Sequence, residues 1–320
     1  MNLSDKIYVA GHRGLVGSAI VRALRKQGYT HLVLRTHAEL DLTQQQQVYD
    51  FFAQEKPDYV FLAAAKVGGI HANNTYRGEF IFNNLAIELN VIEAARCFGA
   101  KKLVFFGSSC SYPRLCPQPM KEAYLLTGPL EPTNEPYAIA KIAGLKLCEA
   151  YNAQYGTQFI SLIPTSLYGP NDNFDLATSH VLPALICKLH QAKIKRDTHV
   201  SFWGTGAAYR EFLHADDLAS ACLFLTNTEH AEFLINIGTG QEITIRDLIT
   251  LVQGVVGFSG DIVFDSSKPD GAPRKLLDTS RLTQLGWHAS LGLEEGVRDT
   301  YRWFLENRGD IPLTQTTQTS

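Results

Sequence analysis

The stretch Tyr137-Ala-Ile-Ala-Lys141 places a phenol and an ammonium group four residues apart. If this stretch is helical, both side chains lie on the same face of the helix. A neighbouring ammonium group stabilises phenolate, so we expect Lys141 to lower the pKa of Tyr137 from its usual value of about 10. Such a phenol can donate and accept a proton near neutral pH. Ser108 follows an apolar run and could bond a substrate oxygen beside Tyr137.

A glycine pattern lies close to the start of the chain. Gly11, Gly14 and Gly17 are evenly spaced and directly follow the apolar run Lys6–Ala10. Glycines at such a position let the chain turn tightly and let its backbone approach a pyrophosphate at the N-terminus of the next helix. Because a strand precedes the pattern and a helical stretch follows it, we interpret it as a dinucleotide-binding loop. The alternative is a glycine turn without a ligand.

The residues after the second apolar run indicate which dinucleotide is bound. Sites for NAD usually carry an acidic residue there, which bonds the ribose 2′-hydroxyl. Here the run ends in Leu34-Arg35-Thr36-His37, without an acid, and Arg13 lies inside the glycine loop. Two cations near the ribose suit a 2′-phosphate. We therefore expect NADP(H) as the cofactor; the alternative is that Arg13 and Arg35 are ordinary surface charges.

Short apolar runs alternate with longer helical patterns in the first half of the chain. The runs are apolar on both faces, as in strands buried within a parallel sheet. This alternation predicts an α/β fold with a Rossmann-type, doubly wound parallel sheet. Strands are expected at Lys6–Ala10, His31–Leu34, Tyr59–Leu62, Leu103–Phe106 and Phe159–Ile163, and helices at Leu15–Gln27, Gln44–Gln54, Phe80–Phe98 and Tyr137–Tyr155.

The pattern becomes less regular after Pro164, which suggests a smaller, interleaved α/β substrate domain. We expect residues 1–166 and 213–240 to form the NADP-binding Rossmann domain, residues 167–212 and 241–309 the substrate-binding domain, and residues 310–320 a polar tail. Further helices are expected at His180–Gln191, from Asp216 or Asp217 to Thr226, at Ile245–Val256 and at Leu293–Asn307, and strands at Val200–Trp203 and Leu234–Ile237.

The charge and cysteine content of the chain argue against several classes of protein. The formal net charge of −3 provides no strong field for nucleic acid or a membrane surface, so neither is expected as a partner. The six cysteines form no Cys-x-x-Cys pair, and no metal site is expected. The first residues lack the features of a signal peptide, and no apolar run reaches the roughly 18 residues of a membrane helix. We expect a cytoplasmic protein.

Seven segments resemble the GDP-L-fucose synthases, a family of extended short-chain dehydrogenases/reductases. They are GHRGLVGSAI, AAAKVGGIHANN, GSSCSYP, LEPTNEPYAIAKIAG, YGPNDNF, REFLHADDLA and KPDGAPRKLLD, and the similarity extends from Lys6 to Asn307. The resemblance implies that GDP-4-keto-6-deoxy-D-mannose is epimerised at carbons 3 and 5 and then reduced at carbon 4 with NADPH. An oxyanion site near Tyr137 and Ser108 would serve all of these steps.

The resemblance also implies roles for individual residues. Ser108, Tyr137 and Lys141 would be catalytic, and Cys110 and His180 would be the base and the acid of the epimerisation. A buried core cysteine and a helix-capping histidine are the alternatives. A histidine ordinarily titrates near pH ~6.5, which suits a proton donor.

The remaining implied residues bind the cofactor or the substrate. The cofactor set is Gly11, His12, Arg13, Gly14, Leu15, Val16, Gly17, Arg35, His37, Asp41, Leu42, Phe106, Gly107, Ser108, Ser109, Lys141, Pro164, Thr165, Ser166, Leu167 and His180. The substrate set is Lys188, Trp203, Arg210, Asp270 and Lys275. Two of these depart from the family pattern, because Lys188 and His37 stand where an arginine is expected. A lysine keeps the charge without the forked geometry, and a neutral histidine weakens the preference for NADP.

Two other functions remain open at this stage. Another extended reductase or epimerase, such as a UDP-sugar 4-epimerase or a GDP-mannose dehydratase, would return its cofactor unchanged. A regulator that binds NADP without catalysis would keep the fold, although the presence of Ser108, Tyr137 and Lys141 speaks against it. By resemblance we also expect a homodimer formed through the helices Phe80–Phe98 and Tyr137–Tyr155.

Overall fold

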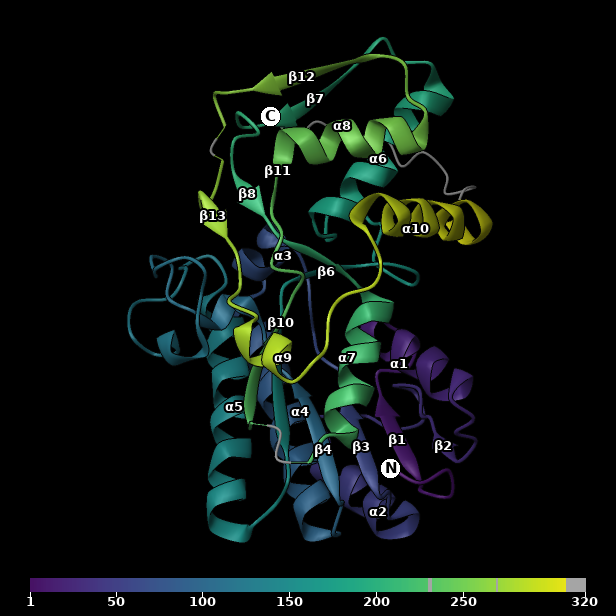
Figure 1. Ribbon diagram of the computed structural model, residues 1–320, viewed down its shortest axis with the longest axis vertical. Helices are drawn as coiled ribbons and strands as arrows, with labels where there is room; N and C mark the ends of the chain where they lie inside the picture. Colours follow the sequence, from purple (N-terminus) through teal and green to yellow (C-terminus); the bar gives the residue numbers. More distant parts are fainter. Residues whose placement is uncertain (230–231, 269, 309–320) are drawn as a thin grey trace.

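The computed structural model describes residues 1–229, 232–268 and 270–308, so the expected polar tail 310–320 lies outside the described residues. A six-stranded parallel sheet occupies the larger, lower part of the molecule in Figure 1, in the order β10-β5-β4-β3-β1-β2. Its strands are β1 (Ile7–Ala10), β2 (Leu32–Val33), β3 (Tyr59–Leu62), β4 (Lys102–Phe106), β5 (Ile160–Pro164) and β10 (Leu234–Ile237). The strand order reverses between β1 and β3, which is the position where such sheets bind ligands.

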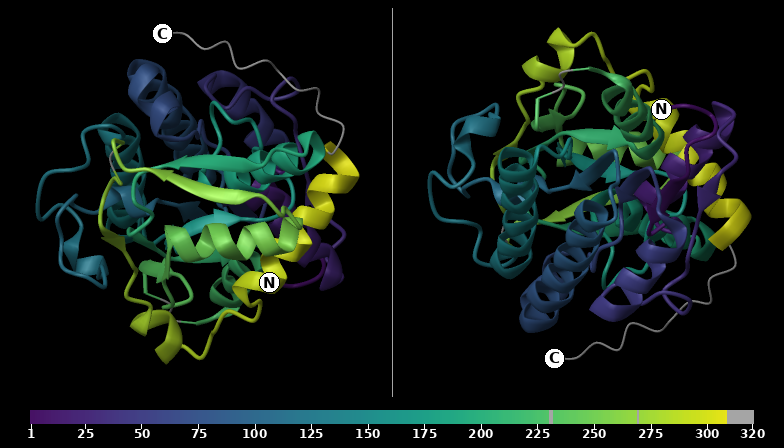
Figure 2. Two further views of the ribbon diagram at one scale, coloured as in Figure 1. Left: turned by 90° about the horizontal axis from the view of Figure 1, so that it is seen from above. Right: turned by 90° about the horizontal axis from the view of Figure 1, so that it is seen from below.

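Side chains alternate between the two faces of this sheet and build a separate core on each. On β1, Ile7 and Val9 belong to one core cluster, whereas Tyr8 and Ala10 belong to the other. The first face is covered by α1 (Leu15–Lys26) and α7 (Ala215–Asn227), and the second by α2 (Gln45–Glu55), α4 (Arg77–Cys97) and α5 (Glu135–Tyr155). Figure 2 shows these helices on both sides of the strands. The expected doubly wound fold is confirmed.

The smaller, upper part of the molecule has a core of its own. Residues such as Leu189 and Leu248 lie in a third cluster, to which three helices and two paired strands contribute, together with Tyr168 and Phe212 from the strands described below. These are α6 (Val181–Lys195), α8 (Ile245–Val256), α10 (Leu293–Arg308), β7 (His199–Trp203) and β12 (Asp261–Asp265). A second small sheet has the order β11-β8-β13, with β11 at Ile243–Thr244, β8 at Tyr209–Arg210 and β13 at Arg274–Lys275. The strands β6 (Ser166–Tyr168) and β9 (Phe212–His214) pair in parallel.

The expected helices and strands are all present; Tyr59–Leu62, Leu234–Ile237 and Ile245–Val256 have the expected bounds, and the ends of the others are shifted. The expected helix at Phe80–Phe98 begins earlier, at Arg77, and that at His180–Gln191 extends to Lys195. Several short elements were not expected, because two to six residues carry too little periodicity to be recognised. They are α3 (Ile70–Thr75), α9 (Ser280–Gln284), β6, β8, β9, β11, β12, β13 and the 3-10 turns η1 (Ser109–Ser111) and η2 (Glu122–Tyr124). Within the described ranges, no helix has both the length and the apolar character needed to cross a membrane.

Candidate active site

The glycine loop connects β1 directly to α1. Gly11 has a φ of +79°, and a Cβ at this position would lie 2.8 Å from the backbone nitrogen of Ala64. A Cβ on Gly17 would overlap the carbonyl oxygen of Gly11, so neither position has room for a side chain. Helix α1 follows Gly14 with no side-chain cap and no acid in its first turn, which leaves its N–H groups available to a phosphate. This loop fits the pyrophosphate of a dinucleotide cofactor.

The segment after β2 contains the cations expected beside the cofactor's ribose. The guanidinium of Arg35 donates hydrogen bonds to Glu55 at 2.7 Å and to the Leu34 carbonyl at 3.1 Å. Glu55 also pairs with Lys6, and the expected position of Arg35 beside the ribose stays a prediction. Arg13 is exposed in the glycine loop, and its charge acts on His12, whose pKa is lowered mainly by desolvation.

His37 and Asp41 form a loose pair in the same segment. The Nδ1 of His37 lies 3.9 Å from the carboxylate of Asp41, and the histidine side chain is 83% exposed. Hydrogen bonds from the backbone and side chain of Thr43 lower the pKa of Asp41. Leu42 differs from these two residues, because its side chain is buried in the core and its carbonyl accepts a hydrogen bond from Asn90. Leu42 therefore supports this segment and does not present its side chain to a ligand.

Ser108 and Tyr137 come together as the sequence predicts. Ser108 follows β4 and opens η1, where its hydroxyl accepts a hydrogen bond from the backbone nitrogen of Cys110 at 3.3 Å. Its hydroxyl is also a hydrogen-bond partner of the Tyr137 phenol, which projects from the first turn of α5. The edge of the Tyr137 ring packs against Phe80 of α4, with 6.3 Å between the ring centroids. Two helices and one strand end thus fix the phenol.

Lys141 lies beside Tyr137 but faces another partner. Its Nζ is 5.8 Å from the centroid of the Tyr137 ring and 3.0 Å from Oε1 of Glu88. Desolvation raises the pKa of Tyr137, the charges of Cys110 and Glu88 raise it further, and the hydrogen bond with Ser108 opposes the rise. The expectation that Lys141 lowers this pKa is wrong, because burial of the phenol raises it and the ammonium group is paired with Glu88.

Cys110 lies in η1, next to these groups. Its sulfur accepts a hydrogen bond from Nδ2 of Asn134 at 3.0 Å. The side chain is only half-buried, which rules out the alternative of a buried core cysteine. Its charge acts on the Tyr137 phenol, so the thiol and the phenol share one neighbourhood. Asn134 was not among the expected site residues.

His180 occupies the position just before α6. Its imidazole makes no capping hydrogen bond with that helix, which rules out the alternative of a capping histidine. The side chain has an exposed surface, yet desolvation by the protein around it lowers its pKa below the ~6.5 expected for a histidine. It is thus a stronger acid than a free histidine.

The segment before His180 is tied to the neighbourhood of Tyr137. The backbone nitrogen of Gly69 donates to the carbonyl of Thr178 at 2.8 Å. A Cβ on Gly68 would lie 3.3 Å from the ring of Phe80, the ring that also packs against Tyr137. The two glycines therefore let the segments of His180 and Tyr137 approach each other.

The carboxyl ends of β4 and β5 contribute the residues expected at the reactive end of the cofactor. Gly107 donates its backbone N–H to Leu162 at 2.8 Å, which aligns the two strand ends. Thr165 is buried and donates through its hydroxyl to the carbonyl of Glu211 at 3.1 Å. The neighbouring expected residues lie along the same edge: Phe106 and Pro164 at the strand ends, Ser109 in η1, and Ser166 and Leu167 in β6.

Three of the five expected substrate residues lie on one small sheet and its flanking loop. Arg210 of β8 is paired in register with Lys275 of β13. Burial lowers the pKa of Arg210, and the charge of Asp270 opposes this effect. The Asp270 carboxylate accepts hydrogen bonds from the backbone nitrogen and hydroxyl of Thr205, both at 2.6 Å. The structure thus brings Arg210, Asp270 and Lys275 together.

The other two expected substrate residues are Lys188, whose side chain reaches from α6 to β7, and Trp203, the last residue of β7. The Nζ of Lys188 donates to the carbonyl of Ser201 at 2.5 Å and lies 4.8 Å from the centroid of the Phe202 ring. Burial lowers the pKa of Lys188. Trp203 ends the strand with 74% of its surface exposed. The next residue, Gly204, contacts Asp270 closely, so the two groups of substrate residues adjoin at this point.

Glu211 organises this side of the site, although no sequence pattern singles it out. One carboxylate oxygen accepts backbone hydrogen bonds from Thr239 and Gly240, both at 2.7 Å. The other oxygen accepts from the backbone of Leu277 at 3.0 Å. The residue is fully buried, and burial raises its pKa. It thereby fastens β8, which carries Arg210, to the segment that carries Lys275.

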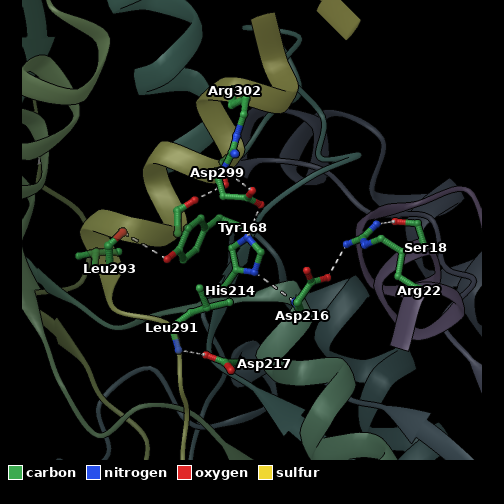
Figure 3. Close-up of polar contacts among 12 residues, drawn as sticks. Ser18, Arg22, Tyr168, His214, Asp216, Asp217, Leu291, Leu293, Asp299 and Arg302 are labelled. Carbon is green, nitrogen blue, oxygen red and sulfur yellow. Dashed lines mark hydrogen bonds and ion pairs between the residues drawn. The ribbon is translucent and has the colours of Figure 1, made fainter. Parts of the chain in front are cut away.

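A further polar cluster connects the two parts of the molecule (Figure 3). His214 of β9 accepts a hydrogen bond from the backbone of Asp216 at 3.3 Å, and its Nε2 lies 3.6 Å from Asp299 of α10. Asp216 also pairs with Arg22 of α1 at 2.5 Å. Asp217 accepts from the backbone of Leu291 at 2.9 Å, just before α10. These bonds fix α10 relative to α1 and α7.

Known proteins match this chain over nearly its whole length. A model of the NAD dependent epimerase/dehydratase family matches residues 7–238. GDP-L-fucose synthase 1 of Arabidopsis thaliana is 60% identical over 304 residues, which cover 95% of this chain and 94% of that protein. GDP-L-fucose synthase of Escherichia coli (strain K12) is 54% identical over 313 residues, which cover 95% and 98%. A solved structure of a GDP-L-fucose synthetase from Naegleria fowleri bound to NADP has a TM-score of 0.90 and 30% identity, covering 96% and 94%.

Proposed function

This chain belongs to the NAD-dependent epimerase/dehydratase family and, within it, to the GDP-L-fucose synthases, and on this premise we propose that it converts GDP-4-keto-6-deoxy-D-mannose to GDP-L-fucose with NADPH. The observation that carries the proposal is the common location of a thiol and a phenol. Cys110 receives a hydrogen bond from Asn134, and its charge acts on Tyr137, which bonds Ser108. A base and an oxyanion site are therefore adjacent.

The epimerisation uses a base and an acid on opposite faces of the sugar. The ketone at carbon 4 makes the hydrogens of carbons 3 and 5 acidic, because loss of either gives an enolate. We assign proton removal to Cys110 and proton return to His180. The exposed surface of His180 lets it take up a proton from water and return that proton to the sugar.

The oxyanion site serves both stages of the reaction. Tyr137 stays a neutral phenol because desolvation raises its pKa, so it donates a hydrogen bond to the oxygen at carbon 4. Ser108 donates a second hydrogen bond to the same oxygen. NADPH, when bound, supplies a hydride to carbon 4. Tyr137 then gives its proton to the oxygen, which completes the alcohol.

We assign cofactor binding to one part of the fold and substrate binding to the other. The glycine loop of α1 would hold the pyrophosphate of NADP(H), with Arg13 near its ribose. We assign residues 1–166 and 213–240 to this cofactor domain and residues 167–212 and 241–309 to a substrate domain. There, Arg210 and Lys275 are paired side by side on neighbouring strands, which suits the diphosphate of a GDP-sugar.

We also propose that the protein is a cytoplasmic homodimer with more than one activity at the same site. Helices α4 and α5 pack together and leave apolar side chains uncovered. Phe82 of α4 is 68% exposed and Leu89 of the same helix 50%, while Ile139 of α5 is 43% exposed. A partner's matching helices would cover these side chains. Sedimentation at micromolar concentration tests this proposal, and a species with the mass of one chain would contradict it.

The proposed reaction is tested by incubating the protein with GDP-4-keto-6-deoxy-D-mannose and NADPH, followed by identification of the product. We expect GDP-L-fucose and the loss of one NADPH per product molecule. Turnover without loss of NADPH absorbance would indicate an epimerase or a dehydratase that returns its cofactor unchanged. Cofactor binding with no turnover of any keto sugar would indicate a regulator.

A further inference from the structure

Glu88 of α4 and Lys141 of α5 form an ion pair inside the protein, beside Tyr137. Their Oε1 and Nζ atoms are 3.0 Å apart, and the side chains are 2% and 4% exposed. A Cβ on Gly144 would lie 2.8 Å from the other carboxylate oxygen of Glu88, so this glycine makes room for the acid. The ring of Phe105 covers the ammonium group, with 4.9 Å from Nζ to the ring centroid. The pair is thus shielded from bulk solvent.

Stability alone gives a weak reason for such a pair. The attraction between two buried charges only partly offsets the free energy lost when both leave water. Apolar residues of similar size would usually serve the packing of α4 against α5 as well or better. The location of the pair next to the phenol therefore suggests a role in the chemistry.

The charged and titratable groups around Glu88 belong to two elements, α5 and η1. Lys141, Tyr137 and Cys148 face it from α5, and the charge of Glu88 acts on both Tyr137 and Cys148. From η1, Cys110 also acts on Tyr137. Burial raises the pKa of Glu88, and Lys141 opposes this rise. Among these groups, Lys141 is the cation and Glu88 is the acid that compensates it.

We propose that Glu88 is a positioning residue that fixes the ammonium group of Lys141 and compensates its charge, so that Lys141 does not offset the burial that keeps Tyr137 a neutral phenol. This inference rests on the proposed function in one respect, which is that Tyr137 acts as the proton donor of the reduction. An uncompensated ammonium group beside the phenol would favour phenolate. A phenolate cannot deliver the proton that the alcohol product needs.

Glu88→Gln tests this role, because it keeps the shape of the side chain and removes the charge. The proton donor must be protonated, so the rate of reduction is lost as the pH rises through its pKa. A lower pKa brings that loss to lower pH. We expect the alkaline limb of kcat against pH to move about one to three pH units toward acid, the usual effect of a close opposite charge.

Ultraviolet absorbance of tyrosinate gives a second readout that needs no turnover. In the protein without substrate, Glu88→Gln should ionise one tyrosine at lower pH than the wild type does. The double variant Glu88→Gln/Tyr137→Phe should lack that additional signal. This titration also separates the two proposals, since it reports on Glu88 even if the keto sugar is not turned over.

Two further variants serve as a conservative replacement and as a control. Glu88→Asp withdraws the carboxylate by one methylene without removing its charge, so we expect a smaller shift in the same direction, even if Glu88→Gln does not fold. Asp217→Asn neutralises another buried carboxylate, whose charge acts on Tyr168 and not on Tyr137, and should lower the free energy of unfolding without moving the alkaline limb of kcat. The proposal is overturned if Glu88→Asp has the same alkaline limb of kcat and the same tyrosinate titration as the wild type. The same outcome in Glu88→Gln, where that variant folds, would overturn it too, because the pair would then be purely structural.

Discussion

Nδ2 of Asn134 lies 3.0 Å from the sulfur of Cys110, and Asn134 immediately precedes α5, the helix that carries Tyr137. An amide N–H directed at the sulfur stabilises the negative charge that a thiolate base carries. A hydrogen bond to a charged group contributes about 1.5–3 kcal/mol. We therefore expect Asn134→Ala to slow deuterium uptake from D₂O into the keto sugar roughly 10- to 100-fold. NMR of the sugar without NADPH measures this rate, and an unchanged rate would remove Asn134 from the site.

Tyr137→Phe separates the two stages of the reaction. The phenol is the proposed proton donor of the reduction, and general acids of this kind typically contribute about 10²- to 10⁴-fold. We expect reduction to slow by that factor, as measured by NADPH absorbance. Exchange at carbons 3 and 5 should remain detectable, because Cys110 is intact and Ser108 still donates to the oxygen at carbon 4. Retained reduction would show that another group delivers the proton.

The glycine loop allows a test of cofactor binding with a matched control. Gly17→Ala places a methyl group against the carbonyl of Gly11, so the loop must shift. We expect NADPH to bind about tenfold more weakly or worse, which is a loss of about 1.4 kcal/mol. Gly254→Ala in α8 meets nothing within 4 Å and should stabilise that helix by about 0.5–1 kcal/mol. NADPH fluorescence and thermal unfolding distinguish the two variants, and equal NADPH affinities would contradict the assignment of the loop.

His214 should make stability depend on pH. Burial lowers its pKa below that of an unfolded histidine, although the carboxylates of Asp216, Asp299 and Asp217 oppose the shift. The folded protein therefore favours the neutral ring, and stability is lost as the pH falls from about 6.5 through the lowered pKa. His214→Gln cannot take up this proton. We expect a smaller loss of unfolding free energy in this variant between pH 7 and pH 5, measured with urea; an unchanged loss would exclude His214 as a source.

Much of the sheet and of the reactive centre follows from sequence patterns. The strands of the large sheet are continuous apolar runs, and the helices between them are long enough to show their period. Gly11 and Gly17 are recognisable because no other residue fits the turn. Ser108 and Tyr137 are recognisable because strand ends and helix starts at one sheet edge must meet.

The remaining site residues depend on contacts that local sequence does not encode. Glu88 lies between Ile87 and Leu89 in the sequence, but its partner Lys141 lies on another helix, so the pair forms only on folding. Arg35 pairs with Glu55, which lies 20 residues away, so the sequence around Arg35 does not indicate this ion pair. Glu211 fastens segments of three different loops, and no spacing rule describes such a contact.

The most direct test of a pocket shared by epimerisation and reduction compares the products that the wild type and Cys110→Ser form in D₂O with NADPH. The deuterium content of each product is measured at each carbon. The wild type should yield GDP-L-fucose with solvent deuterium at carbons 3 and 5. Cys110→Ser should give no solvent deuterium at these carbons, and any reduced sugar it forms should keep the starting configuration. Wild-type deuterium content in the Cys110→Ser product would contradict the account, because the base would then be another group.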